Sequence, residues 1–297
     1  MPGESIAAGR LDAQAPSRGP LWSALAVVLA TVGCAVPGPA APESATDPLR
    51  HRVGVGAPLN AEISCLMSSG TPGETPGATS NLRLILVHGT PGSAAGWADY
   101  LLDPPPHLEV VALDRPGFGR SGPERAVPGL EAQAVAVAAL LPADGRRAVL
   151  LGHSLGGPIV ARVAALYPER VAALVLLAAS LDPGLESIHP MQWIGAWAPV
   201  RWLLPRAIRN ANAELMALKP ELEMLAPLLP QIKAPVLIVH GTQDDLVPVA
   251  NVAFMQAHLS GTRCVKTVLL EGRNHFLPWN SADLVRDAIR QAREAAC

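Results

Sequence analysis

A serine between two glycines stands in the pattern of this sequence that most directly suggests covalent chemistry. The segment GHSLG at residues 152–156 fits G-x-S-x-G, follows an apolar run and opens a helical pattern. That strand, turn and helix are the setting in which a serine nucleophile projects above a sheet. The two glycines leave room for a strained turn, and the amide of Leu155 would face a developing oxyanion. We therefore predict that Ser154 is a nucleophile; a glycine-rich turn without chemistry is the alternative.

A serine hydroxyl is a weak nucleophile and needs a base within hydrogen-bonding reach, together with a carboxylate that orients the base. Asp244 and His275 each follow an apolar run, so both are expected at the carboxyl ends of strands. The chain order Ser, Asp, His is the order that such strand-turn-helix enzymes use. Asp245, adjacent to Asp244, and Asp182, just beyond an earlier run, are the alternative acids.

Other reactive side chains are interpreted as structural. His88, His153 and His240 lie in or beside glycine turns and are expected to serve as hydrogen-bonding groups. No cluster of His, Asp, Glu or Cys has metal-ligand spacing, and residues 89–96 lack the lysine of a phosphate-binding loop. We predict no metal and no other cofactor. With 23 Lys+Arg, 25 Asp+Glu and no run of like charges, no nucleic-acid partner is expected either.

Seven apolar runs separated by helical patterns would position these residues. The 297 residues are 49% hydrophobic and 16% charged, which is enough for one large core. The alternation predicts a doubly wound, mostly parallel α/β sheet, with the more polar first run as an edge. The predicted strands are 59–66, 82–87, 109–113, 148–152, 171–178, 235–240 and 264–270, and the predicted helices are 130–141, 155–166, 249–259 and 282–295, the last opened by Asn280.

One segment interrupts the alternation. Residues 185–231 contain three tryptophans and several prolines and are too long for an ordinary loop, so we expect a helical cap inserted into the core. The core would then comprise residues 49–184 and 232–297. Trp193 and Trp197 lie four residues apart on one helical face, where they could form an apolar lid over the substrate or join cap to core.

Two further segments complete a family pattern: HGTPG at 88–92 and DRPGFGRS at 114–121. With the serine turn and the acid loop, they make the chain resemble the α/β-hydrolase superfamily, specifically its capped serine-nucleophile members, from Leu49 to the C-terminus. The resemblance implies an eight-stranded sheet with a small helical cap. It also implies site roles: Ser154 as nucleophile, His275 as base, Asp244 as orienting acid, and the amides of Thr90 and Leu155 as oxyanion donors.

The nucleophile type limits the chemistry that this resemblance implies. A serine argues against the haloalkane dehalogenases and epoxide hydrolases of the same fold, which form an ester on an aspartate. We expect acyl transfer through an acyl-serine, with a small-molecule ester carrying a hydrophobic portion as substrate. An aminopeptidase, a C–C hydrolase or a perhydrolase would use the same triad, and a non-catalytic binder or a structural lipoprotein would use none of it.

The beginning of the chain has the composition of an export signal. Residues 21–33 are apolar, follow Arg10 and Arg18, and fall short of the roughly 20 residues that span a bilayer. The segment TVGC at 31–34 resembles a lipobox, which implies acylation of Cys34. We expect residues 1–34 to be a lipoprotein signal and the proline-rich residues 35–48 a tether to the cell-envelope membrane. Secretion into the periplasm or medium, or an uncleaved segment, are the alternatives, and the oligomeric state stays open.

The remaining cysteines give one structural expectation. In the order of the family that the chain resembles, the strand with Cys65 lies far from the last strand, so Cys65 should stay single. The last strand rises roughly 23 Å and the last helix descends roughly 22 Å, which would return Cys297 to the level of Cys264. A disulfide between these two, or two free thiols at a frayed end, are the alternatives.

Overall fold

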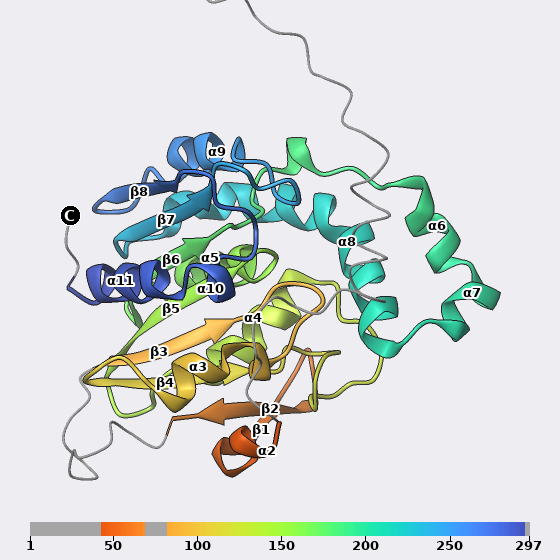
Figure 1. The fold of residues 1–297 in the computed structure, drawn as a ribbon, viewed down its shortest axis with the longest axis horizontal. Helices are drawn as coiled ribbons and strands as arrows, with labels where there is room; N and C mark the ends of the chain where they lie inside the picture. The colour runs from red at the N-terminus through yellow and green to blue at the C-terminus, as the bar shows by residue number, and fades with distance from the viewer. Residues whose placement is uncertain (1–42, 69–81, 295–297) are drawn as a thin grey trace, which may run out of the picture.

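Eight strands in one sheet form the centre of the computed structural model, which describes residues 43–68 and 82–294 (Figure 1). Their order is β1-β2-β4-β3-β5-β6-β7-β8. The first two pairings, β1 with β2 and β2 with β4, are antiparallel, and all others are parallel. The strands are β1 Arg50–Val55, β2 Ala61–Met67, β3 Leu82–Val87, β4 Leu108–Leu113, β5 Arg147–His153, β6 Val171–Leu177, β7 Val236–Gly241 and β8 Val265–Leu270.

The central strands are buried on both faces. In β3, Leu84 and Leu86 join one hydrophobic cluster, whereas Ile85 and Val87 join the other, as the twofold alternation of a strand requires. Burial on both faces explains the continuous apolar runs from β3 to β7. The predicted α/β-hydrolase fold is confirmed.

The edge of the sheet differs from the prediction. All seven predicted runs are strands, but the eighth strand, β1, was not recognised, because its sequence RHRVGV is polar and mostly exposed. β1 pairs only with β2, so it forms the edge at this end of the sheet, and β8 forms the other edge. The expectation that run 59–66 is the edge was wrong, since β2, which overlaps most of that run, is paired on both sides.

Helices cover both faces of this sheet. Residues of α4 and α5 contribute to one hydrophobic cluster, and residues of α3 and α11 contribute to the other. The helix α4 ends three residues before its predicted end, and Ser281 takes the position before α11 that was predicted for Asn280. In residues 43–68 and 82–294, the helices outside the cap are α2 Glu43–Thr46, α3 Ala98–Leu102, α4 Leu130–Ala138, α5 Gly156–Leu166, α9 Asn251–His258, α10 Leu277–Asn280 and α11 Ala282–Arg293, with 3-10 turns η1 Asp47–Leu49, η2 Ala94–Trp97 and η3 Pro183–Leu185.

The cap is the helical segment inserted between β6 and β7. It consists of α6 Pro190–Ala196, α7 Ala198–Leu203, α8 Arg206–Leu225 and the 3-10 turn η4 Ala226–Gln231. The long α8 buries Leu218, Leu222 and Leu225 in the core cluster, whereas α6 and α7 bury no residue. In Figure 1, α6 and α7 project from the body of the molecule at the right. None of the helices in the described ranges has the length and hydrophobicity needed to cross a membrane.

The cysteines follow the expected arrangement as far as the described residues extend. Cys65 is a free, buried thiol on β2, which confirms that it stays single. Burial and the neighbouring carboxylate of Asp114 raise its pKa to about 11, so the thiol is unreactive at neutral pH. Cys264 is disulfide-bonded. Its predicted partner Cys297 lies outside the described residues, as does Cys34, and the pairing stays a prediction.

Candidate active site

The turn between β5 and α5 holds Ser154 in a strained conformation. Its φ is +56°, in the left-handed region that residues with a side chain rarely adopt. The turn is tight because Gly152 and Gly156 lack side chains: a Cβ on Gly152 would lie 2.3 Å from the carbonyl oxygen of Gly156. A Cβ on Gly156 would in turn lie 2.3 Å from the carbonyl oxygen of Val87 on β3. Strain of this kind is typical of functional positions.

Asp244 and His275 meet at the carboxyl ends of β7 and β8. Nδ1 of His275 donates to Oδ2 of Asp244 at 2.8 Å, and both side chains are buried. The other carboxylate oxygen accepts the amides of Leu246 and Val247, at 3.0 and 2.8 Å. Burial alone would raise the pKa of Asp244, but the hydrogen bond from His275 and the amide of Val247 hold it below its ordinary value. Asp244 is therefore ionised, and Nε2 of His275 is left to accept a proton.

The alternative acids have other environments. Oδ1 of Asp182 accepts the amide of Gly184 at 2.8 Å and caps the turn η3, and Asp245 is exposed. Within the described residues, Asp244 is the carboxylate that is hydrogen-bonded to His275. Among the described residues, the hydroxyl of Ser154 forms no hydrogen bond with His275. In sites of this kind, the hydrogen bond between nucleophile and base often forms only when substrate is bound.

Two buried histidines support the loops that carry the acid and the base. Nε2 of His153 donates to the carbonyl of His275 at 2.9 Å, and Nε2 of His240 donates to the carbonyl of Val247 at 2.9 Å. Burial and the neighbouring His275 lower the pKa of His153 to about 3. Burial likewise lowers the pKa of His240. Both rings are therefore neutral and act as the structural groups that their positions beside glycine turns predicted.

The loop after β3 lies against the serine. A Cβ on Gly89 would fall 2.7 Å from Cβ of Ser154, so the Gly89–Thr90 peptide borders the nucleophile. The side-chain oxygen of Thr90 is buried and has no hydrogen-bond partner among the described residues. Thr90 follows Gly89, and Leu155 follows Ser154, so the two predicted oxyanion donors both lie beside the nucleophile.

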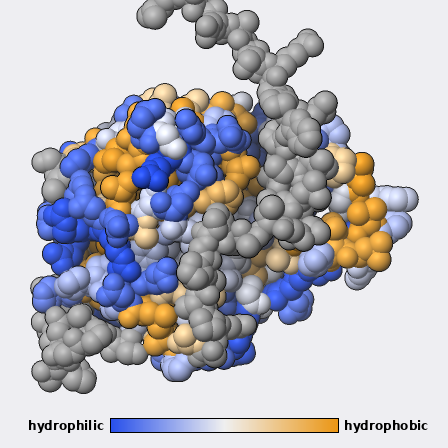
Figure 2. Space-filling model, in the orientation of Figure 1, coloured by the Kyte–Doolittle hydropathy of each residue, from blue (hydrophilic) through white to orange (hydrophobic). Residues whose placement is uncertain are grey.

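The cap tryptophans are exposed, unlike the side chains of Asp244 and His275. Trp193 is 61% exposed and Trp197 is 65% exposed. Figure 2 shows hydrophobic residues gathered on the surface over α6 and α7. With more than half of each indole exposed, they are not buried between cap and core, and their contact with substrate stays a prediction.

Sequence reasoning missed a buried ion pair between the core and the cap. Arg115, after β4, and Glu214, on α8, form two hydrogen bonds of 2.8 and 2.9 Å, and their side chains are 0% and 1% exposed. Arg115 lies within the segment DRPGFGRS that carried the family resemblance, but Glu214 is 99 residues further along the chain. A glutamate on the apolar face of α8 was the available signal, because buried charges require partners.

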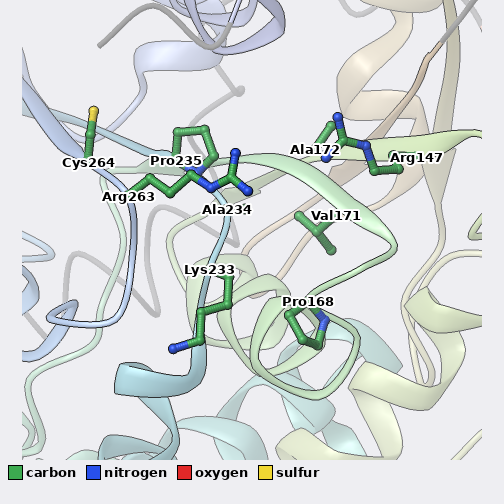
Figure 3. Close-up of a pocket in the computed structure, with 9 residues that line it drawn as sticks. All are labelled: Arg147, Pro168, Val171, Ala172, Lys233, Ala234, Pro235, Arg263 and Cys264. Carbon is green, nitrogen blue, oxygen red and sulfur yellow. The ribbon is translucent and has the colours of Figure 1, made fainter.

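A cavity of about 330 Å³ lies at the opposite end of the strands (Figure 3). It is lined by residues at the amino ends of β5 and β6 and by the segments that precede β7 and β8, including Arg147, Lys233 and Arg263. Asp244 and His275 follow the carboxyl ends of their strands, so this cavity is separate from the candidate site. Residues 43–68 and 82–294 contain no group of three or more His, Cys, Asp or Glu side chains arranged to hold a metal ion.

Comparisons with known proteins agree with the fold. A family model described as alpha/beta hydrolase fold matches residues 83–211. A non-heme chloroperoxidase from Streptomyces lividans is 32% identical over 242 residues, covering 67% of this chain and 87% of the relative. A pimeloyl-[acyl-carrier protein] methyl ester esterase from Klebsiella pneumoniae (strain 342) is 41% identical over 98 residues, 33% of this chain and 37% of the relative. The crystal structure of a bacterial membrane phospholipase A superposes with a TM-score of 0.58 and 25% identity, covering 92% of this chain and 94% of that one.

Proposed function

The chain belongs to the α/β-hydrolase family and is a hydrolase, and from that premise we propose that it is a serine carboxylesterase acting through an acyl-Ser154 intermediate. The observation that carries the proposal is the buried hydrogen bond from Nδ1 of His275 to ionised Asp244, next to the strained turn of Ser154. That bond fixes the tautomer in which Nε2 can act as a base.

The residues divide the reaction between them. The hydroxyl of Ser154 attacks the ester carbonyl and passes its proton to Nε2 of His275, while the carbonyl oxygen becomes an anion that accepts the amides of Thr90 and Leu155. The tetrahedral intermediate collapses, and His275 returns the proton to the leaving alcohol. Water then attacks the acyl-serine by the same route and releases the acid. Asp244 stabilises the charged form of His275 in both steps.

An ester substrate is supported by two of the similar proteins. One is named as a methyl ester esterase and another as a phospholipase A, and both names describe ester hydrolysis. The exposed apolar surface of α6 and α7 supports a hydrophobic portion in the substrate. We test this with p-nitrophenyl esters of increasing acyl length against aminoacyl p-nitroanilides. Cleavage of the anilides without cleavage of the esters would contradict an esterase.

A second candidate follows from the relative named as a non-heme chloroperoxidase. Hydrogen peroxide in place of water could attack the same acyl-serine and release a peracid, which is perhydrolysis. A peracid assay with an ester and hydrogen peroxide distinguishes the two, because an esterase releases acid and alcohol at the same rate with and without peroxide.

We further propose that the enzyme is exported and anchored to the cell-envelope membrane by a lipid on Cys34. The apolar run 21–33 and the lipobox-like segment TVGC support this, and both lie outside the described residues. Mass spectrometry of the N-terminus from the native host should show a diacylglyceryl-modified Cys34 as first residue. An intact Met1 on soluble protein would contradict it.

A further inference from the structure

Two buried donors hold the carbonyl of Gly89. Nδ1 of His88 donates to it at 2.7 Å and Nη2 of Arg115 donates at 3.0 Å. The amide of Arg115 donates to the other ring nitrogen of His88, Nε2, at 3.1 Å, so the ring carries its proton on Nδ1. Burial and the Arg115 cation hold the pKa of His88 well below its ordinary value. The neutral ring and the guanidinium therefore fix the direction of one carbonyl.

That carbonyl shares a planar peptide group with the amide of Thr90. In a trans peptide the C=O and N–H bonds point in opposite directions, and the cis bond in this loop is the next one, Thr90-Pro91. Fixing the Gly89 carbonyl therefore fixes the Thr90 amide as well. Gly89 packs directly against Ser154, so the Thr90 amide lies in the loop beside the nucleophile. The proposed mechanism uses this amide as an oxyanion donor.

The cap helix holds the guanidinium in place. Both carboxylate oxygens of Glu214 on α8 accept from Arg115, and Oε1 also accepts from Gln133 at 3.0 Å. The ring of Phe118 packs on the guanidinium, with Cζ of Arg115 4.8 Å from the centre of the Phe118 ring. The path from the cap to the oxyanion donor is thus continuous: Glu214, Arg115, the Gly89 carbonyl and the Thr90 amide.

We propose that Glu214 is a positioning residue, which through Arg115 and the Gly89 carbonyl orients the Thr90 amide; this one contact of α8, and not the docking of the cap as a whole, sets the oxyanion site. This inference rests on the proposed function and assigns a role to the base of the cap that the triad does not include. An oxyanion donor acts mainly in the transition state, so its loss lowers kcat more than it raises KM.

The first test is Glu214→Gln in the full chain, with p-nitrophenyl acetate as substrate and phenylboronic acid as probe. The boronate adduct on serine places a hydroxyl where the oxyanion would lie. We expect kcat to fall about tenfold, KM to stay within about twofold, and boronate affinity to fall by about the same factor as kcat. Unchanged kcat and boronate affinity would overturn the proposal.

Two matched controls separate this role from docking of the cap in general. Arg206 donates to the carbonyls of Gly119, Ser121 and Pro123, and Asn210 donates to those of Gly117 and Glu124, so both hold α8 to the same loop without contacting Gly89. Arg206→Gln and Asn210→Ala should leave kcat within about twofold. A loss in these controls equal to that in Glu214→Gln would overturn the proposal, because a loosened cap would then account for the effect.

A paired replacement separates positioning from stability. Removing one member of a buried ion pair leaves an uncompensated charge, whereas Arg115→Met with Glu214→Leu removes both charges. The double variant should unfold at a Tm close to that of the unaltered chain and still show the low kcat and weak boronate binding. Recovery of kcat together with Tm would overturn the proposal. Failure of the proposed function looks different: the unaltered chain would hydrolyse no ester, or Ser154→Ala would retain its activity.

Discussion

The two ends of the cap are built in contrasting ways. The base, α8, is fixed to the core by buried polar side chains such as Asn210 and Glu214 and by the apolar residues Leu218 and Leu222. The tip, α6 and α7 with Trp197 between them, buries no residue. Its large exposed side chains are Trp193, Ile194, Trp197, Trp202 and Leu203. Figure 2 shows the tip as an apolar surface at the edge of the molecule.

The difference separates two tasks within one inserted segment. Buried polar groups need partners, so the base and the loops that carry the catalytic residues constrain one another. The tip has few such partners, so its surface can change without altering the triad. We call the triad and the loops that carry it the catalytic edge, α8 the cap base, and α6 and α7 with Trp197 between them the cap tip.

The largest expected effect at the catalytic edge is that of Ser154→Ala. Removing the nucleophile should lower turnover of p-nitrophenyl esters by at least about a thousandfold while the fold is retained, because only binding and oxyanion contacts remain. Trp197→Ala at the cap tip is the matched control and should retain turnover within about threefold. Equal turnover in Ser154→Ala and the unaltered chain would refute the mechanism.

Replacement of the orienting acid should have the next largest effect. Asp244→Asn should lower kcat by about three orders of magnitude, because the amide can no longer hold His275 in the tautomer that leaves Nε2 free. Asp182→Asn is the control, since that carboxylate caps η3. A large loss in Asp182→Asn with none in Asp244→Asn would assign the acid to the loop after β6.

Stability should distinguish the base of the cap from its tip. Leu222 is fully buried, so Leu222→Ala should lower the free energy of unfolding by about 2–5 kcal/mol. Leu203 is 84% exposed, so Leu203→Ala should change the free energy of unfolding by less than about 0.5 kcal/mol. Urea unfolding measures both. Similar losses at the two sites would mean that the tip is packed in solution as firmly as the base.

The buried histidines of the catalytic edge predict a dependence of stability on pH. Burial lowers the pKa values of His88, His153 and His240, so below about pH 6.5 the unfolded chain binds protons that the folded chain does not. The free energy of unfolding should therefore fall as pH decreases, by up to about 1.4 kcal/mol per pH unit for each histidine. For His153 the loss should continue to about pH 3, its pKa in the folded chain.

Substitution of one histidine checks that origin. His153→Gln should flatten the dependence between pH 6 and pH 4, whereas His51→Gln, at an exposed position on β1, should not. The measurement is the unfolding free energy from urea titrations at several pH values. An unchanged slope in His153→Gln would show that another group titrates.

Local patterns in the sequence predicted the elements whose burial is uniform. The strands β3 to β7 were predicted because burial on both faces makes their sequences continuously apolar. β1 was missed because an exposed edge strand such as RHRVGV carries no such pattern. The pairing of Asp244 with His275 was predictable because each residue lies in the loop that follows a strand that the pattern identifies.

Contacts between the core and the cap could not be predicted in this way. Arg115 meets Glu214 across 99 residues, and their meeting depends on where α8 lies on the sheet, which periodicity does not specify. The exposure of Trp193 and Trp197 could not be predicted for the same reason. Helical spacing placed them on one face, but it does not specify whether that face packs against the core or faces solvent. Both features depend on the docking of the cap.

The most direct test of the central claim is to map the residue that a fluorophosphonate modifies. After the full chain is incubated with the reagent, peptide mass spectrometry should find a single phosphonyl adduct on Ser154, with labelling much slower in Asp244→Asn. Esterase activity should fall in proportion to the adduct. An unlabelled Ser154, or an adduct on another residue that accounts for the loss of activity, would contradict the account.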